Sequence, residues 1–283
     1  MSASRRSAAR LALALTLAAG CDRDAPHGAP LQATVPRLDV SGSVALLPLL
    51  LEAANQYMRG NPGVVVMVSG DGAAEALRDL AAGNLAVAGA DVPPSASEAA
   101  GLVDYPLAAV PVAVFANRGP FNEAVRSLTR EQVEGIVTGR ITNWSAVGGR
   151  DQRIVFLDRS RHTGAREALS RWLGTSSFLA GAPEESSAAN VQAALLARPG
   201  ALSYMALPYR HPQLQILALD GVEPPGSAGG AAPYPVWAHE HLYVRADAGA
   251  PARAFIDFVR SPSFEASILV PMGYVPEPPA PDP

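Results

Sequence analysis

The stretch that most constrains the fold reads Asp158-Arg159-Ser160-Arg161-His162-Thr163-Gly164-Ala165-Arg166. The residues before it, 153–157, form a short apolar run with β-branched members, which predicts a strand. After it, apolar residues recur at helical spacing at Ala165, Ala168, Leu169 and Trp172. The stretch therefore predicts a strand, a tight turn and a helix.

This turn has the features of an anion-binding helix end. Thr163 is placed as the N-cap, Gly164 permits the turn, and the backbone amides of residues 164–166 lack partners in the helix. Such an end attracts anions. Guanidinium groups could surround the anion from Arg159, Arg161 and Arg166. The alternative is an ordinary capped helix with solvated arginines, and this segment alone does not decide between the two.

Length and composition indicate a globular protein and argue against some classes of function. The 283 residues can form one or two domains, and we expect two. A hydrophobic content of 48% with 17% charged residues indicates a compact fold. The formal net charge is −4, all basic residues other than histidine are arginines, and no basic stripe occurs. The sequence therefore argues against nucleic-acid binding.

The N-terminus predicts export. Arg5, Arg6 and Arg10 precede an apolar run at residues 11–19, which is too short to span a bilayer, so residues 1–20 read as a secretory signal. The sequence Leu17-Ala18-Ala19-Gly20-Cys21 resembles the lipobox of bacterial lipoproteins. That resemblance implies a lipidated Cys21 and a membrane-anchored protein on the periplasmic or cell-surface side. The alternative is a plain cleaved signal with an incidental cysteine.

Strand, glycine turn and helix recur along the first part of the chain. A strand from Leu38 ends at a turn around Ser43, and the β-branched run at residues 64–68 ends at a turn around Gly72. A third strand, at residues 85–90, ends at Asp91. This alternation predicts parallel sheets, with ligand-binding loops at the carboxyl ends of their strands.

Two further local signals follow. Residues 105–115 predict another strand, and Thr129, with Gln132 three residues later, predicts the cap of a helix.

Several motifs resemble one family in order. Residues 159–166 resemble the Arg-x-x-x-Ser-Gly-Thr-Arg segment of the phosphate-binding proteins that serve bacterial ABC transporters. The sequence Gly139-Arg140-Ile141-Thr142-Asn143-Trp144 resembles their Gly-Lys-Ile-Thr-Asn-Trp, which we interpret as a structural turn with a packed tryptophan. The resemblance covers roughly residues 38–276.

The resemblance implies an α/β fold of the two-lobed periplasmic-binding-protein type II class, with a hinged cleft between the lobes. We expect a signal peptide at 1–20, a flexible tether at 21–36 and a Pro-rich tail at 278–283. Lobe 1 is expected at 37–116 plus 236–277, and lobe 2 at 117–235.

The resemblance also implies the ligand-binding residues: Ser43, Val44, Ala45, Gly72, Ala73, Asp91, Arg159, Thr163, Gly164 and Ala165. Val44, Ala73 and Ala165 stand where relatives have hydroxyl side chains, although their backbone amides would remain as donors. Asp71 adds a negative charge where the family usually has glycine. The hydroxyl replacements predict phosphate binding weaker than is usual for the family.

Catalysis is not indicated, and we expect no enzyme, no cofactor and no metal. The sequence lacks a Gly-x-Ser-x-Gly elbow, a Walker loop and a zinc-type Cys/His set. His239-Glu240-His241 could place two imidazoles on one strand face, but no third metal ligand is suggested.

Two functions stay open from the sequence. One is a monomeric receptor that binds phosphate, or a related oxyanion, for an ABC permease. The other is a descendant of such a receptor that has lost or altered its ligand and acts as a sensor or scaffold.

Overall fold

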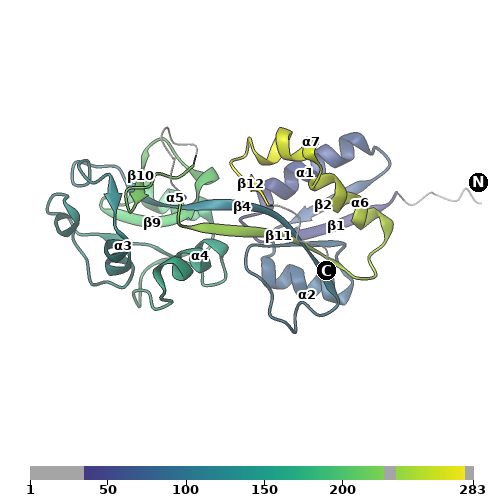
Figure 1. Cartoon of the computed structure of the whole chain (residues 1–283), viewed down its shortest axis with the longest axis horizontal. Helices are drawn as coiled ribbons and strands as arrows, with labels where there is room; N and C mark the ends of the chain where they lie inside the picture. Colours follow the sequence, from purple (N-terminus) through teal and green to yellow (C-terminus); the bar gives the residue numbers. More distant parts are fainter. Residues whose placement is uncertain (1–34, 226–233, 278–283) are drawn as a thin grey trace, which may run out of the picture. The chain divides into compact units, whose positions relative to one another are not determined.

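The structure is a computed structural model that describes residues 35–225 and 234–277 (Figure 1). Its first strands and helices are β1 (Arg37–Gly42), α1 (Leu47–Gly60), β2 (Val65–Ser69), α2 (Ala73–Ala82), β3 (Val87–Ala90) and β4 (Leu102–Asn117). The middle of the chain forms β5 (Ser127–Leu128), α3 (Arg130–Val137), η1 (Trp144–Val147), β6 (Val155–Phe156), β7 (Asp158–Arg159), α4 (Gly164–Leu173), β8 (Glu184–Glu185) and α5 (Ala188–Ala197). The remainder forms β9 (Ala201–Ala206), η2 (Leu207–Tyr209), β10 (Leu214–Leu219), β11 (Trp237–Arg245), α6 (Ala250–Val259), α7 (Pro262–Phe264), η3 (Glu265–Leu269) and β12 (Val275–Pro276).

The first three strands form the predicted parallel sheet. β1 pairs in parallel with β2 on one side and with β3 on the other. Because all three run the same way, their carboxyl ends and the loops that follow them meet at one edge of the sheet. The register places Gly42 opposite Gly89 at that edge. A side chain on Gly42 would approach the Gly89 carbonyl oxygen to 2.8 Å, so the close approach of β1 and β3 depends on glycine.

The long strand β4 connects the strands around β3 and β11 with a second group, β9 and β10. Its first part, up to Pro111, pairs antiparallel with β11, which also pairs with β3. Its last part, from Val112 onward, pairs antiparallel with β9 and β10. In Figure 1, β4 and β11 accordingly run beside each other, with β1, β2, α1 and α2 near one end and β9, β10, α3 and α5 near the other.

Helices cover these strands and bury the apolar faces. Helix α1 packs Leu49, Leu50 and Tyr57 into the main core, where Tyr57 contacts Phe255 of α6 edge to face. Helix α2 packs on a separate small cluster with Ala88, Ala90 and Tyr243. Apolar residues on two faces of one sheet explain why β3 is buried throughout rather than alternating.

The motif at residues 139–144 is structural, as predicted. Trp144 is fully buried and its indole N–H donates to the Gly200 carbonyl at 3.1 Å. Upstream, helix α3 begins with the predicted cap: the Thr129 hydroxyl accepts from the Gln132 amide, and the Gln132 side chain accepts from the Thr129 amide.

Some predicted boundaries were wrong. The run at 153–157 forms a strand only at Val155–Phe156, because the chain then leaves β9 and pairs with β8 instead. Strand β4 begins at Leu102, before the predicted start at Tyr105.

The chain from Val35 onward forms one compact unit, so the predicted lobe boundaries stay predictions. The signal peptide, Cys21, most of the tether and the tail lie outside the described residues. Within the described part of the chain, no helix has the length and apolarity needed to cross a bilayer.

Candidate functional site

The turn between β7 and α4 is built as predicted in outline but differs in detail. Thr163 is the N-cap residue of α4, yet its side chain does not cap the helix and instead donates to the Ser160 carbonyl at 2.8 Å. The Gly164 amide, predicted to be unpaired, donates to Asp91 Oδ2 at 2.8 Å. The amides of Ala165 and Arg166 have no acceptor among the described residues.

Arg159 is a buried cation with unused donors. Its side chain is only 4% exposed, and burial lowers the pKa of its guanidinium. The Nε atom donates to the Glu185 carbonyl at 3.2 Å, while the terminal nitrogens have no acceptor in the described part of the chain. A buried guanidinium with free N–H groups is well suited to bind an oxyanion.

Arg166 does not face the same space, so its predicted role was wrong. Its guanidinium lies 3.0 Å from Asp158 Oδ1, donates to Ser170 Oγ at 2.6 Å, and stacks over the Phe178 ring at 3.2 Å. Arg161 lines the same separate hollow as Arg166. Neither contributes to the site around Arg159.

A cavity of about 300 Å³ lies against Arg159, and we call it the Arg159 cavity. It is formed by the loops that follow β1, β2, β3 and β7, together with the start of α5. Its lining residues are Ser43, Val44, Ala45, Asp71, Gly72, Ala73, Ala74, Glu75, Arg78, Asp91, Arg159, Ser160, His162, Thr163, Ser186 and Ala188. The structure thus brings together eight of the ten predicted ligand residues; Gly164 contacts Asp91 directly, and Ala165 lines an adjoining smaller cavity.

Backbone amides supply further donors to the Arg159 cavity. Among the described residues, the amides of Val44 and Ala45 have no acceptor, and the same holds for Ala73 at the start of α2. Val44 and Ala73 are two of the three residues at which the resemblance implies a lost hydroxyl, and their amides remain as donors. The Ser43 hydroxyl accepts from the Leu46 amide at 3.3 Å, so it is partly used in its own turn.

Two acidic residues in the cavity are held in different ways. The exposed Asp71 carboxylate accepts from the hydroxyls of Ser69 and Ser41, which lower its pKa. Asp91 is 5% exposed; burial raises its pKa, while the Gly164 amide, Ser43 and the charge of Arg159 oppose this. The approach of Asp91 to α4 requires glycine, because a Cβ on Gly164 would lie 2.5 Å from the Asp91 carbonyl oxygen.

Two functional candidates were missed from the sequence. Tyr209 donates its hydroxyl to the Ala45 carbonyl at 3.0 Å, and Glu240 lies fully buried beside Asp91 and Arg159. The signal for Glu240 was available: an acidic residue in a strand whose inward positions are otherwise apolar. His239 pairs with Glu277 and His241 with Asp104 at 2.7 Å, and the described residues contain no metal-binding cluster.

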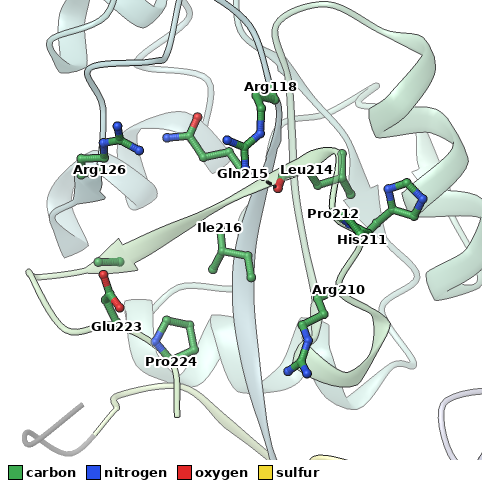
Figure 2. Close-up of a pocket in the computed structure, with 11 residues that line it drawn as sticks. Arg118, Arg126, Arg210, His211, Pro212, Leu214, Gln215, Ile216, Glu223 and Pro224 are labelled. Atoms are coloured by element: carbon green, nitrogen blue, oxygen red, sulfur yellow. Dashed lines mark hydrogen bonds between the residues drawn. The ribbon is translucent and has the colours of Figure 1, made fainter. Parts of the chain in front are cut away.

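A second cavity, of about 600 Å³, lies beside β10 (Figure 2). It contains Arg118, Arg126 and Arg210, but Figure 2 shows Arg118 and Arg126 near Gln215 and Arg210 at the other end. The three guanidinium groups therefore do not converge on one anion. Their exposure also contrasts with the buried Arg159.

Comparisons with known proteins agree on one family. The sequence matches the PBP superfamily domain over residues 25–263. It is 30% identical over 243 residues to the phosphate-binding protein PstS of Bacillus subtilis (strain 168), covering 84% of this chain and 80% of that protein.

Solved structures have the same fold. A substrate-binding protein from Clostridium perfringens with bound phosphate matches with a TM-score of 0.76 and 22% identity, over 86% of this chain and 100% of that one. An ABC-type phosphate transport receptor from Vibrio cholerae matches with a TM-score of 0.69 and 24% identity, over 85% of this chain and 100% of that one.

Proposed function

Because this chain belongs to the PBP superfamily and to its PstS-like phosphate-binding family, we propose that it is a receptor that binds phosphate for an ABC transporter. In this role the protein acts outside the cytoplasm, where it delivers the bound solute to a permease. It performs no catalysis. The relatives whose descriptions name phosphate or phosphate transport supply the ligand class.

The observation that carries the proposal is the buried Arg159 with free terminal nitrogens at the wall of the Arg159 cavity. Phosphate presents several acceptor oxygens, and Arg159 can donate to two of them at once. Free amides at Val44, Ala45 and Ala73 line the same cavity from the turn after β1 and the start of α2, so they can bind the other oxygens. The cavity volume is ample for an anion of this size.

Asp91 supports phosphate over sulfate. An ionised Asp91 is only an acceptor, so it can bind hydrogen phosphate through the anion's own hydroxyl. Sulfate near neutral pH has no proton to give and would meet the carboxylate as like charge in a partly desolvated site.

The alternative is a sensor or scaffold that no longer binds phosphate. The side chains of the Arg159 cavity are the observation that favours it. Val44 and Ala73 line it, and Ala165 lines the adjoining one, and none of the three provides a hydroxyl donor. Each lost donor to an anion removes about 1.5–3 kcal/mol. We therefore expect weaker binding than in relatives that retain these hydroxyls.

Calorimetric titration of residues 37–283 with phosphate, sulfate and molybdate separates the two functions. The receptor proposal expects saturable phosphate binding that is tighter than sulfate binding. Absence of binding to all three anions would favour the scaffold alternative.

Membrane attachment through Cys21 is a separate part of the proposal. Acyl chains on this cysteine would anchor the protein on the periplasmic or cell-surface side. In a bacterial host, Cys21→Ser should release the protein from the membrane fraction. Unchanged membrane association of that variant would contradict the lipid anchor and leave phosphate binding unaffected.

A further inference from the structure

Two buried carboxyl groups next to the Arg159 cavity have oxygens without hydrogen-bond partners. Glu240 in β11 is 1% exposed, and Asp91 after β3 is 5% exposed. Among the described residues, Glu240 Oε2 and Asp91 Oδ1 are both buried and unpartnered. Buried polar atoms are rarely left in this state, because each lost hydrogen bond costs about 1–3 kcal/mol.

Both carboxyl groups line one small enclosed space, which we call the Glu240 cavity. Its volume is about 20 Å³, enough for about one water molecule. Arg159, Thr163 and Ala45 line both this cavity and the Arg159 cavity, so the two spaces adjoin. Glu240 lines only the Glu240 cavity, so the shared lining residues separate it from the Arg159 cavity.

The groups that face Glu240 come from several elements. They are Asp91 after β3, Arg159 in β7, Tyr209 in η2, Tyr274 before β12 and Glu277 after β12. Burial raises the pKa of Tyr209 to about 12 and that of Tyr274 well above its ordinary value, so both phenols are neutral near pH 7. Arg159 is then the one cation among these groups. The negative charges are those of Asp91, which lines the Glu240 cavity, and Glu277, which does not.

The surroundings favour a proton on Glu240 more than on Asp91. Burial raises the pKa of Glu240 well above its ordinary value, and the charges of Asp91 and Glu277 raise it further. Asp91 keeps its charge more readily, because the Gly164 amide and Arg159 both favour the ionised form. A protonated Glu240 can donate its O–H group, and Asp91 Oδ1 has no donor among the described residues. One water molecule in the Glu240 cavity could link the two carboxyl groups.

We propose that Glu240 is a positioning residue for phosphate, acting through Asp91: its protonated carboxyl supports binding in the Arg159 cavity, and its ionised carboxylate opposes it. This inference rests on the proposed function. An ionised Glu240 places a second negative charge beside Asp91 in a buried region, where a single arginine must balance both and the ligand. Phosphate affinity then falls as pH rises through the titration of Glu240, by at most about tenfold per pH unit.

The test compares phosphate dissociation constants of the wild type and Glu240→Gln, measured by calorimetry from about pH 5 to about pH 10, because burial moves the pKa of Glu240 upward from its ordinary value. Phosphate changes its own charge over this range, but that effect cancels in the ratio of the two constants at each pH. Glutamine keeps the shape and a neutral donor. We expect the wild-type dissociation constant divided by that of Glu240→Gln to be near 1 at the acid end. This ratio should rise with pH, because only the wild type gains a negative charge.

Two further variants separate this role from simple packing. Glu240→Ala removes the donor, so it should bind phosphate more weakly than Glu240→Gln at the acid end. Glu277→Gln, outside the Glu240 cavity, should keep the pH-dependent loss but shift it to lower pH, since one neighbouring negative charge is gone.

The outcomes are distinct. A ratio that stays constant across the pH range would overturn the role of Glu240 while leaving phosphate binding established. No phosphate binding by the wild type at any pH would contradict the proposed function itself.

Discussion

Arg159 and Arg166 flank the same turn but differ in what their guanidinium groups contact. The Arg166 guanidinium contacts Asp158, Ser170 and the Phe178 ring, whereas the terminal nitrogens of Arg159 have no acceptor in the described structure. Sequence spacing placed both near the turn and could not distinguish them. The difference depends on partners outside the turn, such as Glu185 for Arg159 and Ser176 for Arg166.

Replacing Arg159 with alanine should weaken phosphate binding by roughly 10- to 150-fold. The change removes charge-assisted hydrogen bonds worth about 1.5–3 kcal/mol. Arg161→Ala is the matched control, because Arg161 lines a different hollow and should leave the affinity unchanged. Calorimetric titration of both variants measures this directly, and a larger loss in Arg161→Ala than in Arg159→Ala would refute the assignment.

Asp91→Asn should narrow the preference for phosphate over sulfate, mainly by improving sulfate binding. Asparagine removes the negative charge that opposes sulfate, and its amide can donate to a sulfate oxygen. Competition titrations with the two anions on the wild type and the variant provide the measurement. Sulfate binding by the wild type that equals or exceeds phosphate binding would refute the argument.

At the scale of elements, the contact between the β3 loop and α4 depends on Gly164. Gly164→Ala would place a Cβ within 2.8 Å of the Asp91 Cβ and closer still to its carbonyl oxygen. One of the two backbones must shift, so we expect a loss of about 1–3 kcal/mol in the free energy of unfolding together with weaker phosphate binding.

Gly60→Ala provides the control, since a Cβ there meets nothing within 4 Å. Denaturant unfolding and titration of both variants test the expectation. Wild-type stability and affinity in Gly164→Ala would show that the Asp91 contact is not required.

The elements best predicted from sequence were those with local signals. The β-branched run of β2, the capping box of α3 and the strand–turn–helix at α4 follow from residues close together in the chain. The short strand β6 was overestimated because its pairing with β9 is non-local.

The candidate site divides in the same way. Ser43, Gly72, Asp91 and Thr163 follow strand ends, where the loops of a parallel sheet meet, so they could be predicted. Strand-end reasoning does not reach Glu240 or Tyr209, because they come to the site through antiparallel pairing of β11 with β3 and β4 and through the turn after β9. Only the acidic residue among apolar inward positions of β11 marks Glu240 in the sequence.

At the scale of the molecule, two of the hydrogen bonds that join the predicted lobes lie beside the Arg159 cavity: Tyr209 to the Ala45 carbonyl and the Gly164 amide to Asp91. We propose that the lobes lie at residues 37–116 plus 236–277 and at 117–235, and that phosphate closes them by hinge motion. Solution scattering should then give a smaller radius of gyration with phosphate than without it. Tight phosphate binding at an unchanged radius would contradict the hinge.

The central claim is that phosphate binds in the Arg159 cavity. The most direct test is a crystal structure of the protein with phosphate, at a concentration just above its measured dissociation constant. We predict an anion between the Arg159 guanidinium and the start of α4, with an oxygen facing Asp91. Phosphate bound beside Arg118 and Arg126 instead, with the Arg159 cavity holding only water, would contradict the account.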